Sequence, residues 1–245
     1  MITYLKLGRY GRFGNQLFQI AGTIGIAKKF GYNFGFPEWK NYDHKERFNS
    51  DEDINIQDYF VNKLPGIDHV NYPEFPIKWG FHDIHVPDNV SLFGHMQSEK
   101  YFLHCKDLLK HYFQLKKLCD HNIKENDVCI HVRLGDYDGN YHTRLGLDYY
   151  MKAMKQFSGE FHVFSDDPEK AYKIFRKNAK GILSNHYMID FYLMCQFKNF
   201  IIGNSSYSWW PAWLHGSKVV APKNWFGPAC KVKADDIYAK NWIIL

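Results

Sequence analysis

Residues 128–136 read VCIHVRLGD, an apolar run that ends in a polar turn at Gly135 and Asp136. A short apolar run bounded by turn residues is typical of a buried strand. Side chains two positions apart share one face of a strand, so His131 and Arg133 are expected to point the same way. Parallel sheets bind their ligands at the carboxyl ends of their strands. The stretch therefore predicts a buried strand that delivers polar side chains to a ligand site.

Strand and helix patterns alternate on both sides of this stretch. Such alternation predicts an α/β fold built on parallel, doubly wound sheets. A polar stretch at 119–127 divides the chain into two such halves, 1–120 and 121–245. The expected strands cover 2–7, 91–95, 128–133, 161–164, 200–202 and 219–221, and the expected helices cover 15–28, 101–118, 149–157, 167–175, 191–197 and 208–214.

The composition is ordinary for a globular protein, with 45% hydrophobic and 23% charged residues in a chain of 245. The formal charge of +5 is spread along the chain without a block of like charges. This pattern does not argue for nucleic acid, and a phosphate-bearing small molecule accounts for it equally well. The 17 Tyr, 20 Phe and 7 Trp either fill the core or stack on sugar rings, and core filling is the commoner use.

Cysteine usage and hydropathy indicate a cytoplasmic catalytic unit. Five cysteines at irregular spacing, without a CxxC pair, favour free thiols over a disulfide framework or a zinc site. The first residues lack the basic lead and apolar region of a signal peptide. No apolar run approaches the length of a membrane span, so none is expected.

The first polar cluster is GRFGNQ at residues 11–16, directly before a helical pattern. Gly11 and Gly14 let the backbone approach a ligand, and the amides of a helix start favour anions. Asn15 and Gln16 add two amide side chains to this turn. The alternative interpretation is an ordinary tight turn.

Arg133 is the cation best placed for an anionic ligand. An arginine fork binds a diphosphate bidentately and stays charged throughout turnover. In a transferase, Arg133 would stabilise the departing nucleotide diphosphate. The alternative is an ion pair between Arg133 and Asp136 that only holds the loop.

Two acidic residues, Asp166 and Asp167, follow the expected strand at 161–164. Asp167 precedes Pro168 and is a good helix N-cap. We therefore assign capping to Asp167. Ligand contact is assigned to Asp166, whose carboxylate can accept hydrogen bonds from a ribose or from guanine nitrogens.

Asn204, Ser205 and Ser206 lead the expected strand at 200–202 into a helix. The start of this helix is another seat for an anion, because its amides and its dipole attract negative charge. Since all four polar clusters follow expected strands, we expect them to form one shared site. Three residues of this helix follow helical spacing and are expected in the core rather than under a sugar: Trp209, Trp210 and Trp213.

In this order, the clusters resemble the motifs of the alpha-1,2-fucosyltransferase family and its relatives among the alpha-1,6-fucosyltransferases. GNQLFQ at 14–19 resembles the opening motif of the family, and residues 131–136 resemble its His-x-Arg-Arg-Gly-Asp motif. The resemblance covers about residues 4–30 and 128–226. Its other matching stretches are LDYY at 147–150, FSDD at 164–167, NSSYSWW at 204–210 and APKNW at 221–225.

This resemblance implies a GT-B-like fold, in which two Rossmann-like halves with parallel sheets face a cleft. It implies GDP-fucose as the donor, a glycan as the acceptor, inversion at the anomeric carbon, and no metal ion or other cofactor. Residues 1–120 would be the acceptor-side half, and residues 121–245 would bind the GDP-sugar donor.

The resemblance also implies roles for single residues. Arg133 would hold the diphosphate, while His131 and Asp166 would seat the nucleotide. The other implied donor-binding residues are Gly14, Asn15, Gln16 and Asn204, together with Ser205 and Ser206 on phosphate.

Inversion by direct displacement needs a base for the acceptor hydroxyl. The loop after Arg133 offers Asp136, Asp138 and His142. Asp136 follows the strand closely and is expected to brace Arg133. Asp138 lies next to a glycine and is freer to face an acceptor, so it is the expected base and His142 is the alternative. An ordinary polar loop is the competing interpretation.

One position departs from the family motif, because Leu134 stands where the family has a second arginine. Arg12 or Arg144 is expected to supply another cation. The departure leaves a same-fold transferase with another nucleotide sugar as the first alternative. A metal-dependent GT-A enzyme is the second, since residues 51–53 read DED, although they follow a polar loop rather than a strand. The third is a noncatalytic sugar- or nucleotide-binding module, which the intact Arg133 argues against.

Overall fold

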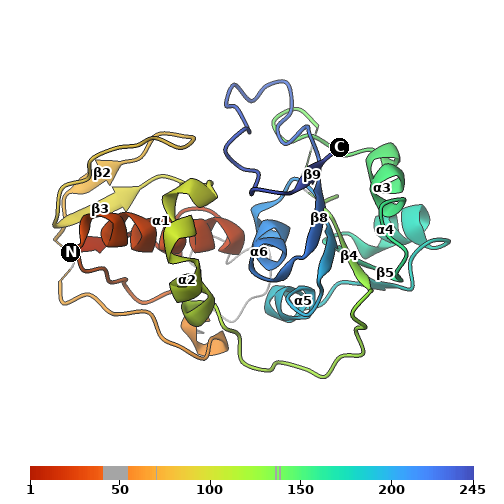
Figure 1. The fold of residues 1–245 in the computed structure, drawn as a ribbon, viewed down its shortest axis with the longest axis horizontal. Helices are drawn as coiled ribbons and strands as arrows, with labels where there is room; N and C mark the ends of the chain where they lie inside the picture. Colours follow the sequence, from red (N-terminus) through yellow and green to blue (C-terminus); the bar gives the residue numbers. More distant parts are fainter. Residues whose placement is uncertain (41–54, 70, 136, 138) are drawn as a thin grey trace. The chain divides into compact units, whose positions relative to one another are not determined.

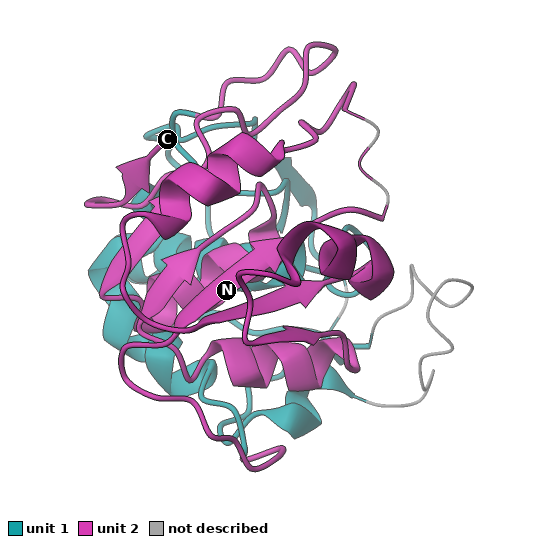
Figure 2. Ribbon diagram, turned by 90° about the vertical axis from the view of Figure 1, so that its right-hand side faces the viewer, with its two compact units in different colours: residues 1–116, 235–237 teal, residues 117–234, 238–245 magenta. Residues whose placement is uncertain are grey.

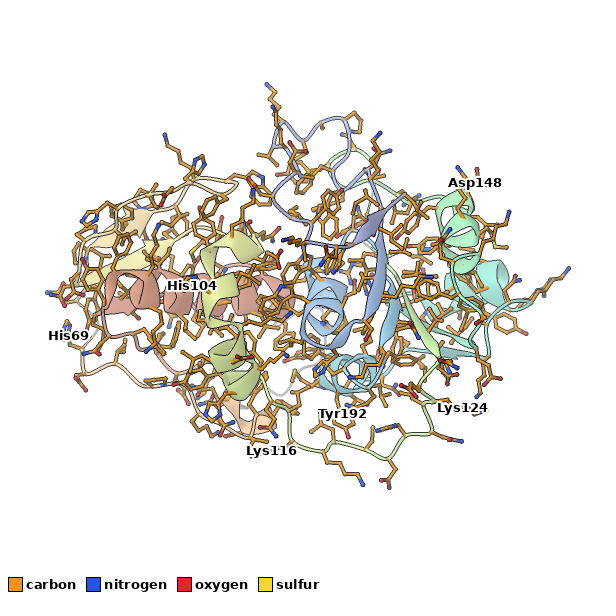
Figure 3. The ribbon with its side chains drawn as sticks, viewed as in Figure 1. His69, His104, Lys116, Lys124, Asp148 and Tyr192 are labelled. Atoms are coloured by element: carbon orange, nitrogen blue, oxygen red, sulfur yellow. The ribbon has the colours of Figure 1, made fainter. Side chains whose placement is uncertain are left out.

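The computed structural model describes residues 1–40, 55–69, 71–135, 137 and 139–245. The chain divides into two compact units (Figure 2). Unit 1 comprises residues 1–116 and Asp235–Ile237, and unit 2 comprises residues 117–234 and 238–245. Lys116, labelled in Figure 3, ends the first segment of unit 1. The acceptor and donor roles expected for the two halves stay predictions.

Unit 2 is built on a parallel sheet of six strands in the order β6-β5-β4-β7-β8-β9. The parallel α/β fold predicted from the sequence is therefore confirmed. The sequence did not predict the short strands β6 and β9, because strands of two or three residues carry no clear apolar pattern. The strands are β4 (Val128–Val132), β5 (Phe161–Ser165), β6 (Gly181–Leu183), β7 (Asn199–Ile201), β8 (Lys218–Ala221) and β9 (Ile243–Ile244).

Helices cover both faces of this sheet. Figure 1 shows α3 (Leu147–Met154) and α4 (Pro168–Phe175) on one side, with α5 (Tyr187–Met194) and α6 (Ser206–His215) on the other. After β4 the chain adds β5 and β6 on one side of β4. It then crosses to the other side of β4 and adds β7 and β8 there. The order of the strands thus reverses between β4 and β7. Such a switch point leaves a crevice at the carboxyl ends of the two strands, where α/β proteins bind their ligands.

The central strand β4 is buried along its whole length. Val128, Ile130 and Val132 belong to a core cluster with residues of α3 and α4. Strand side chains alternate between faces, so Cys129 and His131 point to the other side of the sheet. The ring of His131 accordingly meets Tyr207 of α6, with the ring centroids 5.6 Å apart.

Unit 1 is a smaller parallel sheet in the order β1-β3-β2, with β1 at Ile2–Thr3, β2 at Glu74–Pro76 and β3 at Val90–Phe93. Helix α1 (Phe13–Phe30) follows β1 and ends at Gly31, which takes the left-handed conformation with φ 72°. Glycine stops a helix in this way at low cost, so α1 ends close to the end of the helix expected over 15–28. Among the residues of unit 1 that the structure describes, the remaining elements are three short 3-10 turns, Ile56–Tyr59, Glu99–Tyr101 and Leu103–Cys105, and helix α2 at Lys106–Tyr112.

The helix expected over 101–118 was wrong at both ends. Two 3-10 turns precede α2, and the helix ends before Phe113 because the following residues pair with another segment. The amide of Val61 donates to the carbonyl of Gln114 at 2.8 Å, and the amide of Lys116 donates to the carbonyl of Tyr59 at 2.9 Å. This extended pairing is a tertiary contact that the helical spacing of the sequence does not reveal.

The helix expected over 191–197 begins earlier, at Tyr187, after His186 at the N-cap position. Within the parts of the chain that the structure describes, no helix combines the length and the apolar character needed to cross a membrane.

Asp127 offers a test of how the amino-terminal edge of β4 is held. Its buried Oδ2 accepts a hydrogen bond from the amide of Lys124 (labelled in Figure 3) at 3.1 Å and lies 2.9 Å from Nε2 of His162. Burial opposes ionisation of Asp127, but these two hydrogen bonds outweigh it and lower the pKa of the carboxyl group. A lowered pKa means that Asp127 contributes fully to stability above the ordinary carboxyl pKa. This contribution is lost as the pH falls below that value and through the lowered pKa of the folded protein.

We predict that Asp127→Asn lowers the free energy of unfolding by about 1–3 kcal/mol at neutral pH. The difference should shrink at a second pH of about 3, below the ordinary carboxyl pKa, because the stabilisation is lost as the pH falls through the lowered pKa of the folded protein. Urea unfolding at the two pH values measures both effects. Asp120→Asn is the control, because Asp120 is 92% exposed in its ion pair with Lys117. An equal loss at both pH values would contradict the assignment.

Candidate active site

Arg133 leaves β4 at the switch point of the unit 2 sheet. Its Nη1 lies 3.0 Å from Oδ2 of Asp166, with the two side chains 17% and 20% exposed. The guanidinium also lies over the ring of Tyr137, 5.9 Å from the centroid. Asp136, which the sequence offered as an ion-pair partner for Arg133, lies outside the described residues. The structure thus shows an oriented, partly accessible cation whose counter-ion comes from the neighbouring strand.

Asp166 also holds the turn that follows Arg133. Its Oδ1 accepts a hydrogen bond from the amide of Leu134 at 2.8 Å, and its Oδ2 accepts one from the amide of Gly135 at 3.1 Å. A Cβ on residue 135 would lie 2.6 Å from that oxygen, so glycine is needed for the carboxylate to approach. Leu134, at the position of the second family arginine, packs against the core cluster. Contact of Asp166 with a ligand stays a prediction.

His131 lies just inside this turn as a neutral, buried imidazole. It is 4% exposed, and its burial lowers the pKa to about 4 although the charge of Asp166 opposes the shift. Among the described residues, its Nδ1 has no hydrogen-bond partner. A Cβ on Gly203 would lie 3.7 Å from this nitrogen, so the missing side chain keeps space beside it. At this nitrogen a neutral imidazole can donate or accept one hydrogen bond, with a nucleobase or a hydroxyl group as its partner. It offers no positive charge to a phosphate.

Asn204 braces the loops around the switch point. Its Nδ2 donates to the carbonyls of Thr143 at 2.9 Å and Trp225 at 2.8 Å, and its own carbonyl accepts from the hydroxyl of Tyr137 at 2.8 Å. The side chain is 3% exposed. In the structure, Asn204 therefore holds the loop that follows Arg133. Direct contact of Asn204 with the donor stays a prediction.

Ser205 and Ser206 stand at the start of α6. Ser205 is the N-cap residue, and its hydroxyl accepts from the amide of Tyr207 at 3.3 Å. The positive end of the helix dipole faces this position and favours an anion there.

The expectation that the tryptophans of this helix belong to the core is confirmed, since the following residues are at most 4% exposed: Trp209, Trp210 and Trp213.

The loop after β4 is ordered by contacts of its own. Both Nε and Nη2 of Arg144 donate to the carbonyl of Tyr137, at 3.0 and 2.7 Å. The ring of His142 stacks on the ring of Tyr137, with the centroids 4.5 Å apart. The sequence offered Arg144 as a second cation for the donor, but in the structure its guanidinium group donates hydrogen bonds to the loop. Of the three candidate bases only His142 is placed, because Asp136 and Asp138 lie outside the described residues.

The predicted cap at Asp167 is confirmed. Its side chain accepts a hydrogen bond from the amide of Lys170 at 3.0 Å, and Pro168 occupies the first turn of α4.

The first polar cluster belongs to unit 1. Gly14 is buried in the first turn of α1, and Asn15 accepts a hydrogen bond from Nε2 of Gln97 at 2.7 Å. Gln16 is fully buried, with its Oε1 accepting from Nε1 of Trp39 at 2.7 Å and its Nε2 donating to the carbonyl of Gly11 at 2.8 Å. These side chains hold the loop between β1 and α1, and their contact with a donor stays a prediction.

No group of three or more His, Cys, Asp and Glu side chains suited to a metal occurs among the residues that the structure describes. The acidic residues at 51–53 lie outside that part of the chain. Metal independence therefore remains a prediction.

The model of the family described as Glycosyl transferase family 11 matches residues 10–245. The chain belongs to glycosyl transferase family 11. It is similar to an Escherichia coli protein named Alpha-1,2-colitosyltransferase, with 30% identity over 88% of this chain and 90% of that one. It is also similar to the Escherichia coli O-antigen biosynthesis glycosyltransferase WbnK, with 32% identity over 66% of this chain and 63% of that one.

Two crystal structures of NodZ resemble the fold of this family 11 glycosyltransferase. The NodZ alpha-1,6-fucosyltransferase soaked with GDP-fucose gives a TM-score of 0.56 at 14% identity, over 91% of this chain and 94% of that one. The fucosyltransferase NodZ from Bradyrhizobium gives 0.55 at 14% identity, over 89% and 94%. At this identity the likeness concerns the fold, and the expected GT-B-like α/β class is confirmed.

Sequence reasoning missed the supporting roles of three residues, although it named Gly135 as a turn residue and Arg144 as a second cation. Tyr137 and Arg144 position the loop, and Gly135 admits the carboxylate of Asp166. Gly135, two positions after Arg133, was the local signal for this approach.

Proposed function

We propose that this glycosyltransferase moves fucose from GDP-fucose to a hydroxyl of a glycan acceptor, with inversion and an α-1,2 linkage. The observation that carries the proposal is the pairing of Arg133 with Asp166 at the switch point of the unit 2 sheet. This is the place where α/β sheets bind nucleotides, in a chain whose family transfers sugars. The motif resemblance to alpha-1,2-fucosyltransferases supports the donor and the linkage.

The chemistry follows from charge. In the transfer, the bond between the anomeric carbon and the β-phosphate oxygen breaks while the acceptor oxygen attacks from the opposite face. The departing diphosphate gains negative charge, which the fork of Arg133 and the amino end of α6 stabilise. The neutral ring of His131 and the carboxylate of Asp166 are suited to the nucleoside. The acceptor proton passes to a base in the loop after Arg133, for which Asp138 remains our choice.

A second donor deserves a test because one relative is named a colitosyltransferase. Colitose is fucose without its 3-hydroxyl group, so the two donors differ by one hydrogen-bonding group. A pocket that binds this hydroxyl rejects the deoxy sugar strongly, whereas an apolar pocket discriminates weakly. Comparing kcat/KM for GDP-fucose and GDP-colitose therefore decides which sugar the enzyme prefers.

Donor selectivity should appear as a thermal shift. We predict that GDP and GDP-fucose raise the melting temperature by several degrees, while UDP- and CMP-sugars leave it unchanged. A ligand at 100 times its dissociation constant stabilises the folded state by about 2.7 kcal/mol. The guanine nucleotide is favoured by the carboxylate of Asp166 and the neutral imidazole of His131. An equal or larger shift with a UDP-sugar would show that the donor is misassigned.

Transfer should survive removal of divalent metal. We predict unchanged rates in EDTA, because the guanidinium of Arg133 can neutralise the leaving diphosphate. Rates are measured by GDP release with EDTA alone and with added Mg²⁺ or Mn²⁺. Loss of activity in EDTA that either metal restores would instead place a metal ion in the reaction.

A further inference from the structure

Three ring-bearing side chains follow the three strands of unit 1 at the same edge of its sheet. Tyr10 lies after β1, Trp79 after β2 and His95 after β3. The rings of Tyr10 and His95 stack with centroids 4.7 Å apart at 21°, and Trp79 meets His95 edge-on at 6.1 Å. Because the strands are parallel, this cluster occupies the carboxyl edge of the sheet, where α/β sheets bind ligands. We call Tyr10, Trp79 and His95 the ring cluster.

The backbone around His95 is held in an unfavourable conformation. Gly94 has φ 152° and Met96 has φ 50°, a left-handed value that costs a residue other than glycine about 1–3 kcal/mol. The hydroxyl of Tyr4 donates to the carbonyl of Gly94 at 3.1 Å and accepts from its amide at 3.4 Å. A Cβ on Gly94 would lie 2.5 Å from the carbonyl oxygen of Ile77. Strain fixed by the surrounding structure in this way is typical of ligand sites.

The loop that carries Tyr10 is held by hydrogen bonds from side chains of helix α1. Nε2 of Gln19 donates to the carbonyl of Tyr10 at 2.6 Å, and Nε2 of Gln16 donates to the carbonyl of Gly11 at 2.8 Å. Both glutamines are fully buried. The segment that follows His95 is also tied to the first turn of α1, because Nε2 of Gln97 donates to Oδ1 of Asn15 at 2.7 Å. Buried side chains therefore hold the backbone of the loop that carries Tyr10, which suits a preformed binding site.

Packing alone does not explain why residue 95 is a histidine. Its Nδ1 is buried and makes no hydrogen bond to any residue that the structure describes. Burial lowers the pKa of the ring, so the side chain is neutral near pH 7. A phenyl ring would stack on Tyr10 equally well and would leave no nitrogen unpaired. A buried polar atom without a partner in a native fold points to a role outside folding.

We propose that the ring cluster binds a neutral sugar ring of the glycan acceptor, with the imidazole of His95 bonded to one of its hydroxyl groups. The proposal rests on the proposed function and adds the place of the second substrate. The apolar face of a pyranose packs on aromatic rings, and its hydroxyls need neutral partners. Arg133 and the start of α6, which the proposed function assigns to the diphosphate, belong to unit 2, whereas the ring cluster belongs to unit 1 and is neutral, as a site for an uncharged sugar requires.

The experiment measures sugar binding and donor binding separately. The full chain is titrated against immobilised oligosaccharides that end in galactose, glucose or N-acetylglucosamine, and separately against GDP. His95→Phe keeps a ring on Tyr10 but removes both nitrogens, and we expect at least a tenfold loss of sugar affinity with unchanged GDP affinity. Trp79→Ala, at a half-buried position, should weaken sugar binding in the same way. His95→Asn, which places an amide near the Nδ1 position, should recover part of the loss.

A matched control lies at the opposite edge of the same sheet. His69, labelled in Figure 3, stacks on Tyr72 with centroids 4.2 Å apart at 16°, before β2 rather than after it. His69→Phe should leave both affinities unchanged. The proposal is overturned if His95→Phe and Trp79→Ala bind every sugar as the wild type does, or if they lose GDP affinity in the same proportion. It is also overturned if the wild type binds none of the sugars at millimolar concentration.

Failure of the proposed function gives a different result. A wild-type protein that binds sugars through His95 but binds neither GDP nor GDP-fucose would refute the donor and leave the ring cluster in place.

Discussion

Replacing Arg133 with lysine is expected to lower the transfer rate about 100-fold or more while the fold stays intact. Lysine keeps the charge but lacks the planar fork that binds two phosphate oxygens at once. Its ammonium can still approach Asp166, so the turn after β4 should survive. Rates of GDP release, GDP affinity and the melting temperature, measured on the same preparation, separate loss of catalysis from loss of structure.

Arg176→Lys is the matched control, because Arg176 is exposed just after α4 and in the same unit. It should transfer at the normal rate. Near-normal turnover in Arg133→Lys would mean that Arg133 only holds the turn through its ion pair with Asp166.

Asp166→Asn is expected to lower kcat/KM by about 10- to 100-fold, with most of the loss in donor affinity. The carboxylate accepts hydrogen bonds from two consecutive amides and pairs with Arg133. An asparagine keeps one oxygen and turns an amide group toward the other N–H, so one hydrogen bond and the ion pair are lost together. Hydrogen bonds to a charged group contribute about 1.5–3 kcal/mol, which corresponds to this range.

The neighbouring residue supplies the control. Asp167→Asn should leave donor affinity and kcat/KM unchanged, since asparagine caps a helix as well as aspartate does. Titration with GDP and with GDP-fucose, together with steady-state kinetics, tests both variants. If Asp166→Asn binds the donor as tightly as the wild type, the turn after β4 does not depend on this carboxylate and our account of the site is wrong.

Much of the fold could be predicted because its signals are local. The apolar run of β4 is buried as expected. Gly31 ends α1 because a residue without a Cβ takes the left-handed conformation at low cost, and Asp167 begins α4 because its side chain caps the helix. The helix expected to run to residue 118 failed for the opposite reason. Its last residues find hydrogen bonds with a distant segment around Phe60, and no local pattern records that competition.

The sequence by itself determined the parallel α/β class and the side chains that follow each strand, because apolar periodicity and turn residues act over a few neighbours. Only the tertiary structure decided which of these side chains meet. Arg133 pairs with Asp166 because β4 and β5 are adjacent in the sheet, and His95 stacks on Tyr10 because β1 and β3 are adjacent. Strand order is set by the packing of whole helices against the sheet, so contacts across strands are fixed by the fold rather than by any short stretch of residues.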